Sequence, residues 1–381
     1  MRGPLAFIMT KRMKKYLTAL IGLILSSCSN GQTTVAENGI EISNDGITKE
    51  QSELLFENTK LFPNNTQLSL ALIKSGKVDF IGIERINDTI KLIENYKNAF
   101  EIGSITKVFT ATLLSNFIND QELKLDDNIQ DYLDFKVNSG NVITFKELAN
   151  HTSGLPRLPS NLNLLFVDQN NPYKDYNKEK LVDYLTKEAK LNQEPGIKYE
   201  YSNLGAGVLG FGLATIAKST YELLLQEKIF TKYKMVNSSS RRENLKTELV
   251  KGLKANGEPT SNWDFDVLAG GGAILSTVED LSKFALAQFD IANKELALTQ
   301  RPTFKVNENM SIGLGWHILK RKNGGELIWH NGGTGGYTSS MALDLENKNG
   351  IVILSNVSAF NEKMGNIDQL CFGLIKTLDE E

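Results

Sequence analysis

The sequence contains few of the residues that several common protein classes require. Its 381 residues include two cysteines and three histidines, and His151, His317 and His330 lie far apart along the chain. Two cysteines cannot build a disulfide framework, and a metal site made of cysteine or histidine pairs has little support. A net charge of −3 gives no electrostatic basis for binding nucleic acid or an anionic membrane. We therefore expect no metal, no cofactor and no nucleic-acid partner.

Motifs of other well-known enzyme classes are also missing. The chain has no Gly-x-Ser-x-Gly elbow, which argues against an α/β-hydrolase, and no dinucleotide fingerprint after a strand. The triplet Gly270-Gly271-Gly272 is not a phosphate loop, because no Gly-Lys-Ser/Thr follows it. The triplet instead predicts that the backbone passes close to a neighbouring segment, which we expect to be the functional site.

The first 28 residues differ in character from the rest of the chain. Lys and Arg gather at positions 11–15, and an apolar run follows over residues 17–25. This run is too short for an ordinary transmembrane helix and is typical of a signal peptide. It ends in Leu25-Ser26-Ser27-Cys28, which resembles the bacterial lipobox, where the cysteine carries the lipid. We expect a lipid-anchored protein of the cell envelope on the periplasmic side; the alternative is a plain secretory signal with an incidental cysteine.

The remaining chain predicts a short tether and one large domain. Residues 29–50 are polar and contain scattered glycines, which is typical of a linker between a lipid and a domain. Residues 51–381 are long enough to bury one sizeable core. Cys371 lies on the apolar face of a helical pattern and is expected to be a core residue rather than a nucleophile.

The hydrophobic pattern of this domain predicts an α/β (α+β) fold in which helices flank an antiparallel sheet. Strands are expected in an N-terminal hairpin and in a C-terminal meander, and a mainly helical subdomain is inserted at about residues 119–267. The expected strands are 68–73, 78–83, 90–93, 313–321, 326–330, 338–345 and 351–356, with Asn323-Gly324 and Asn349-Gly350 in hairpin turns. The expected helices include 108–118, 144–150, 178–188, 204–218 and a final one at 364–378.

Ser104 and Lys107 form the first candidate catalytic pair. Gly103 precedes the serine and an apolar helical run follows, so the lysine lies one helical turn away on the same face. A serine hydroxyl is a weak nucleophile at neutral pH and needs such an activating neighbour. The structural alternative is that Ser104 only caps the helix.

Tyr201 is the candidate base, in Tyr201-Ser202-Asn203 before a glycine-spaced helix. A tyrosine is a poor base unless neighbouring cations favour phenolate, and Lys107 can provide one or can transfer the proton itself. Asn203 is expected to hydrogen-bond Lys107 or a substrate amide. Tyr96 has the same spacing to an asparagine, but its position before the serine turn indicates a packing residue.

His330-Asn331-Gly332-Gly333 is the third candidate element. An apolar strand leads to the histidine, and the glycines would let a substrate backbone lie along this edge. The N–H groups of Gly333 and Ser104 would then form an oxyanion hole. The similar Lys-Asn-Gly segments at 322–324 and 348–350 are expected in solvated turns.

Together these residues resemble the serine β-lactamase and penicillin-binding protein superfamily, in the branch of class C β-lactamases, D-Ala-D-Ala carboxypeptidases and related esterases. The resemblance covers about residues 68–375 and implies a β-lactamase/transpeptidase-like fold with the site between the sheet and the helical subdomain. It implies that Ser104 is acylated and that Lys107 and Tyr201 handle its proton. Asn203 would contact the substrate amide, and His330, Asn331 and Gly332 would bind substrate.

One departure from the family pattern leaves the substrate open. Class C β-lactamases usually carry Lys-Thr-Gly where this chain has His330-Asn331-Gly332. Neutral imidazole would hold a substrate carboxylate less firmly than lysine. The resemblance implies hydrolysis of β-lactams or D-Ala-type peptide amides, and the alternatives are an esterase of the same fold or a penicillin- or peptidoglycan-binding sensor without turnover. The expected partner is such a small molecule or peptide, with membrane contact only through the lipid anchor.

Overall fold

A large mixed sheet organises the computed structural model, which describes residues 34–40, 47–322 and 324–379. Its strands lie in the order β1-β4-β3-β2-β12-β11-β10-β9-β8-β7, and every neighbouring pair is antiparallel except β1 and β4. The strands are β1 (Glu37–Asn38), β2 (Gln67–Lys74), β3 (Lys77–Ile86), β4 (Thr89–Ile93), β7 (Phe304–Asn307), β8 (Met310–Ile312), β9 (His317–Lys320), β10 (Glu326–Gly333), β11 (Thr338–Asp344) and β12 (Asn349–Ser355). Pairing of β2 with β12 joins the N-terminal hairpin to the C-terminal meander.

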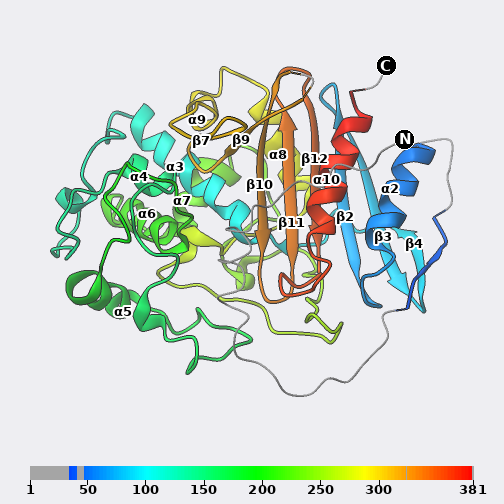
Figure 1. Cartoon of the computed structure of the whole chain (residues 1–381), viewed down its shortest axis with the longest axis horizontal. Coiled ribbons are helices and arrows are strands. Elements are labelled where there is room, and N and C mark those ends of the chain that lie inside the picture. Colours follow the sequence, from blue (N-terminus) through cyan, green and yellow to red (C-terminus); the bar gives the residue numbers. More distant parts are fainter. Residues whose placement is uncertain (1–33, 41–46, 323, 380–381) are drawn as a thin grey trace. The chain divides into compact units, whose positions relative to one another are not determined.

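Helices cover both faces of this sheet (Figure 1). Helices α2 (Lys49–Thr59) and α10 (Asn366–Thr377) pack on one face, and α8 (Val278–Gln288) packs on the other. The strands alternate accordingly: Ile351 and Ile353 of β12 belong to the core under α10, whereas Val352 and Leu354 belong to the core on the opposite side. Burial on both faces explains why β2 and β12 are almost continuously apolar.

The final helix confirms the apolar stripe in the sequence. Ile367, Leu370, Cys371, Leu374 and Ile375 are all buried against the sheet. Each such side chain contributes roughly 1.5–3 kcal/mol when it is removed from water. Cys371 is a core residue, and burial raises the pKa of its thiol to about 12.

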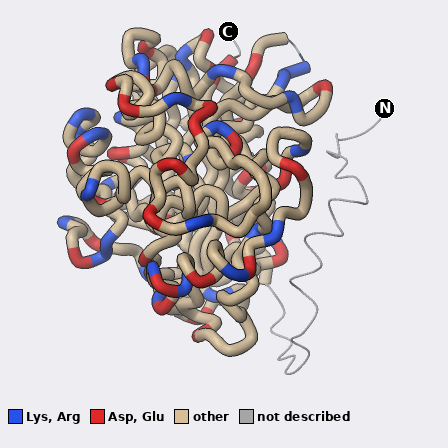
Figure 2. Tube along the Cα trace, turned by 90° about the vertical axis from the view of Figure 1, so that its left-hand side faces the viewer, with Lys and Arg blue, Asp and Glu red and all other residues tan. Residues whose placement is uncertain are grey.

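The chain between the two short paired strands β5 (Phe100–Glu101) and β6 (Leu275–Ser276) holds most of the helices. They are α3 (Thr106–Asn119), α4 (Phe145–Ala149), α5 (Lys178–Asp183), α6 (Asn203–Ile216) and α7 (Tyr221–Leu225), with α9 (Lys294–Thr299) after α8. Short 3₁₀ or π-helical turns lie at Gly103–Ile105, Ile129–Tyr132, Ser160–Leu162, Tyr184–Glu188, Gln226–Phe230, Arg242–Asn244 and Ala269–Gly271. Helix α3 packs against α4, α6 and α7, so this region shares one core with the sheet. Figure 2 shows basic and acidic residues interspersed on the helical side of the molecule.

Several local predictions differ from the structure. Asn349 and Gly350 begin β12 instead of forming the turn, and Asn349 is buried, with its amide donating to the carbonyl of Leu378. Strand β9 starts only at His317, because residues 313–316 form a loop. Strand β10 runs three residues further than expected, through Gly333.

The N-terminal predictions fall partly outside the described residues. The expected signal peptide at 1–28, Cys28 and much of the segment 29–50 lie there. The described part of that segment packs onto the domain: β1 pairs with β4, and Ala36 and Ile40 are buried. Residues 36–40 are therefore not a free tether, which corrects the expected boundary. Among the described helices, no single one is long and apolar enough to cross a membrane. Helix α6 and the segment Tyr221–Phe230 have the required length and composition only when taken together, and the pair is bent by 85°.

Candidate active site

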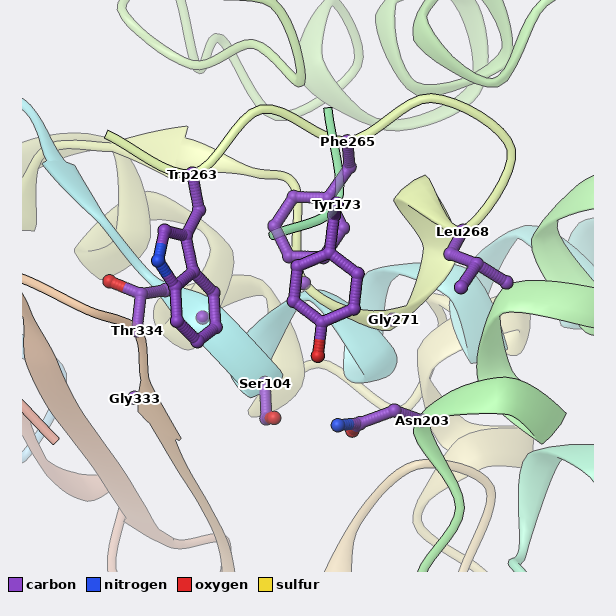
Figure 3. A pocket seen from close by; sticks show the side chains of 11 residues that line it. Ser104, Tyr173, Asn203, Trp263, Phe265, Leu268, Gly271, Gly333 and Thr334 are labelled. Atoms are coloured by element: carbon purple, nitrogen blue, oxygen red, sulfur yellow. The ribbon is translucent and has the colours of Figure 1, made fainter. Parts of the chain in front are cut away.

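Ser104 lies in a tight turn between β5 and α3, where its hydroxyl faces a pocket (Figure 3). Gly103 has a φ of +50°, and a Cβ there would lie 2.5 Å from the nitrogen of Gly333, so only glycine fits without strain. Within the described chain, neither this turn nor α3 receives a side-chain cap at its N-terminus. Ser104 therefore does not act as a helix cap.

Lys107 lies one turn further on and is buried beside the serine. Its Nζ is 2.9 Å from Oγ of Ser104 and donates to the carbonyl of Gly271 at 2.6 Å. The glycine triplet thus passes close to the site, as the sequence indicated. Burial, and then the charge of Arg157, lower the pKa of Lys107 well below its ordinary value. A neutral amine next to the serine hydroxyl can accept its proton.

Tyr201 lies in the loop before α6 and completes this group. Its ring centroid is 4.9 Å from Nζ of Lys107, 5.3 Å from Cζ of Arg157 and 4.4 Å from the ring of His151. Burial raises the pKa of Tyr201 to about 12, and this outweighs the hydrogen bond with Ser104 and the charge of Arg157, which lower it. At neutral pH the phenol is therefore protonated, and Lys107 is the better first base.

Asn203 begins α6 and faces Ser104 across the pocket (Figure 3). Its Oδ1 is buried and has no hydrogen-bond partner among the described residues, so it is available for a substrate N–H. Tyr173, Trp263 and Phe265 form an aromatic wall above the serine, with Tyr173 stacked on Phe265 at 4.5 Å between centroids. Sequence reasoning missed this wall, because its members lie in loops without a periodic signal.

The end of β10 forms the opposite wall. The ring of His330 lies 6.3 Å from that of Tyr201; its Nδ1 is 2.6 Å from the carbonyl oxygen of Asn331, and burial lowers its pKa well below the ordinary value. His330 is therefore neutral. Gly333 lines the pocket with Ser104. Gly332 is needed for packing, because a Cβ there would lie 2.0 Å from the carbonyl oxygen of Ile102.

Asn331 does not belong to the pocket, which corrects its expected role in substrate binding. Side chains alternate along β10, so Asn331 points to the face under α10, where its Nδ2 donates to Asp368 at 2.7 Å. The second tyrosine-asparagine pair is also separate from the site. Tyr96 stacks on Phe80 at 4.8 Å between centroids, as expected for a packing residue.

The fold gathers the three histidines around Tyr201, although they are far apart in sequence. His151 has a φ of +60°, and its Nδ1 accepts the backbone N–H of Ser202 at 3.2 Å, which anchors the loop that carries Tyr201. The ring of His317 lies 5.1 Å from that of His330, and its Nε2 is 3.0 Å from the hydroxyl of Tyr199. In the described part of the chain no three His, Cys, Asp or Glu side chains are arranged to hold a metal ion.

Glu101 is a second feature that sequence reasoning missed. Its Oε1 accepts the side-chain amide of Asn262 at 2.8 Å and the backbone N–H of Trp263 at 2.9 Å. The carboxyl group therefore holds the loop that carries the aromatic wall, three residues before the serine. Burial raises the pKa of Glu101 to about 7. The sequence does contain a sign of this role, because Glu101 is a charged residue within an otherwise apolar run before Gly103.

Comparisons with known proteins identify the family of the chain and its fold. The Beta-lactamase family profile matches residues 68–370. Protein flp of Staphylococcus aureus (strain N315) is 24% identical over 312 residues, which cover 76% of this chain and 59% of that protein. Beta-lactamase-like protein 4 of Dictyostelium discoideum is 26% identical over 322 residues, 74% of this chain and 53% of that protein. The chain thus matches little more than half the length of these relatives.

A solved structure shares the fold. The octameric penicillin-binding protein homologue from Pyrococcus abyssi superimposes with a TM-score of 0.70 and 22% identity, covering 86% of this chain and 76% of that one. This likeness confirms the predicted sheet flanked by helices. Because the family profile spans most of the sequence, the chain belongs to the Beta-lactamase family, within the serine β-lactamase and penicillin-binding protein superfamily.

Proposed function

We propose that the protein is a serine hydrolase that forms an acyl-enzyme on Ser104 and acts on β-lactams or on D-Ala-type peptide amides. Proteins of this family are generally serine hydrolases. The observation that carries the proposal is the distance of 2.9 Å between Nζ of Lys107 and Oγ of Ser104, with the amine buried and its pKa lowered. Such a pair is what a serine nucleophile requires for activation at neutral pH.

The surrounding groups support a full acylation step. Lys107 takes the proton as Oγ of Ser104 attacks the substrate carbonyl, and the protonated phenol of Tyr201 is placed to give a proton to the leaving group. The backbone N–H groups of Ser104 and Gly333 would stabilise the oxyanion, a contribution worth about 10²- to 10³-fold per donor. Oδ1 of Asn203 would accept a hydrogen bond from the acyl amide. Lys107 then passes the serine proton to the phenolate of Tyr201, which restores both groups. In deacylation, Lys107 takes a proton from the water that attacks the ester carbonyl and passes it to Oγ of Ser104 as the ester bond breaks.

A second candidate is an esterase of the same fold, favoured by the state of His330. Its imidazole is neutral and buried, and Nε2 has no partner among the described residues. The segment His330-Asn331-Gly332-Gly333 therefore offers no cation to a substrate carboxylate, whereas a neutral ester needs no such cation.

One experiment distinguishes these functions. The purified domain is incubated with a β-lactam, a D-Ala-D-Ala peptide and an aryl ester, while turnover and intact mass are followed. We expect turnover of at least one amide and an adduct on Ser104, both abolished by Ser104→Ala. Ser115→Ala, which removes another buried serine of the same region, is the matched control.

Each other outcome has a distinct meaning. Turnover of the ester alone would establish the esterase, and a stable adduct without turnover would indicate a penicillin- or peptidoglycan-binding sensor. Absence of both adduct and turnover with all three compounds would refute acyl-enzyme chemistry.

We also propose that the mature protein is anchored to a bacterial envelope membrane through a lipid on Cys28. The proposal is based on the apolar run and the lipobox-like sequence that precedes Cys28. Cys28→Ser should release the protein from the membrane fraction. Unchanged membrane retention of this variant would contradict the lipid anchor.

A further inference from the structure

The pocket above Ser104 offers no charged side chain to a substrate. The described residues that line it are serine, threonine, asparagine, glycine, leucine and aromatic residues. Lys107 lies behind the serine, where it is buried and donates to Gly271, and His330 is neutral. A substrate carboxylate therefore needs a cation from the rim of the pocket.

Arg157 is a candidate for this cation: it is not among the residues that line the pocket, but the backbone holds it beside Asn203, which does line the pocket. Its carbonyl oxygen accepts the N–H groups of Asn203 at 3.0 Å and Leu204 at 3.1 Å. The preceding carbonyl, of Pro156, accepts the hydroxyl of Ser202 at 2.7 Å. Three hydrogen bonds thus join this short segment to Ser202, Asn203 and Leu204, which directly follow Tyr201.

The guanidinium group of Arg157 lies over the Tyr201 ring, with Cζ 5.3 Å from the centroid. Its charge also acts on Lys107 and Tyr173, so its field covers both the catalytic pair and the aromatic wall. The side chain is exposed, and no acidic residue in the described part of the chain forms an ion pair with it. An arginine held by a cation–π contact, without an acidic partner, has N–H donors left for a carboxylate.

We propose that Arg157 is the anion-binding residue of the pocket and selects acyl donors that carry a carboxylate. This inference rests on the proposed function and narrows its substrate class to anionic peptides, β-lactams or esters. Arginine suits this task because it stays charged at every working pH and binds carboxylates through two parallel hydrogen bonds. The guanidinium group thus provides the cation that a neutral imidazole at position 330 lacks.

The test compares two esters that differ only in charge. One is a depsipeptide ester whose leaving group bears a free carboxylate, and the other is its methyl ester. Arg157→Gln should lower kcat/KM for the charged ester about 10- to 100-fold, mainly through KM, as expected for a lost charge-assisted hydrogen bond. The same substitution should change kcat/KM for the methyl ester less than about threefold. Arg157→Lys should retain part of the activity on the charged ester that Arg157→Gln loses.

The controls separate recognition from an effect on Tyr201. Arg241→Gln removes another exposed arginine and should leave both esters unchanged. Added salt should weaken the preference of the wild-type protein for the charged ester and should not affect Arg157→Gln in this way.

Two results would overturn the inference while the proposed function stands. The first is an equal loss on both esters, which would mean that Arg157 acts through Tyr201. The second is turnover of both esters by the wild-type protein without preference. If neither ester acylates Ser104, the proposed function itself fails, and the inference fails with it.

Discussion

Replacing Glu101 by Gln should stabilise the fold at pH 8 and leave it nearly unchanged at pH 4.5. Burial raises the pKa of this carboxyl from its ordinary value of 4.5 to about 7. The native state therefore holds the proton more tightly than the unfolded chain does. The stability gained from the protonated form is complete below pH 4.5 and is lost as the pH rises to 7.

The size of the effect follows from the difference of 2.5 pKa units between 7 and 4.5. At about 1.36 kcal/mol per unit this amounts to roughly 3 kcal/mol of unfolding free energy, as an upper estimate. Glutamine cannot ionise, so the variant does not lose this unfolding free energy as the pH rises. Its Oε1 can still accept hydrogen bonds from Asn262 and Trp263.

Urea unfolding of both proteins at pH 4.5 and pH 8 measures this difference. We expect Glu101→Gln to be more stable than wild type by about 2–3 kcal/mol at pH 8 and to show a flatter dependence on pH. An equal or lower stability of the variant at pH 8 would show that the ionised carboxylate is well accommodated, and would refute the reasoning.

Glu222 provides the matched control. Burial alone would raise the pKa of Glu222, but hydrogen bonds from Ser240, Gln226 and Ser239 outweigh it, and the pKa is lowered. Its contribution to stability is therefore present above pH 4.5 and is lost as the pH falls. Glu222→Gln should destabilise the protein at pH 8, opposite in sign to Glu101→Gln.

The remaining predictions concern the catalytic groups and one glycine. Tyr201→Phe should lower kcat at least about 100-fold, whereas Tyr96→Phe should have little effect; equal effects of the two substitutions would contradict a role of Tyr201 in proton transfer. Because the pKa of Lys107 is lowered, kcat/KM should rise with pH along a limb below pH 10.5, and Lys107→Arg should remove this limb with most of the activity. Gly332→Ala should cost at least about 1–3 kcal/mol in urea unfolding, because its Cβ would meet a backbone oxygen, whereas Gly365→Ala, which meets nothing within 4 Å, should be tolerated.

Much of the framework was predictable because it depends on local patterns. The strands of the hairpin and meander and the stripe of α10 follow from alternation and helical periodicity, which are properties of short segments. The proximity of Ser104 and Lys107 is equally local, since residues three apart share a helix face. The turn positions were less predictable, and Asn349 shows why: its buried hydrogen bond to the Leu378 carbonyl outweighs the turn preference of an Asn-Gly pair.

The roles of the individual site residues depended on distant parts of the chain. Asn331 and His330 are neighbours in sequence, yet the pleat of β10 places one under α10 and the other beside Tyr201. The glycine at position 332 was expected to make room for substrate, but it makes room for the carbonyl of Ile102.

The sequence by itself determined the sheet flanked by helices and the Ser104-Lys107 pair, because each rests on residue types and spacings within short segments. The family followed from the resemblance of three motifs, taken together along the chain, to a known superfamily. Only the tertiary structure distinguishes the two candidate bases, since burial raises the pKa of Tyr201 and lowers the pKa of Lys107. It alone brought Glu101, Arg157 and the aromatic wall to the site. Burial and proximity arise from contacts between segments more than 40 residues apart, and no local pattern predicts them.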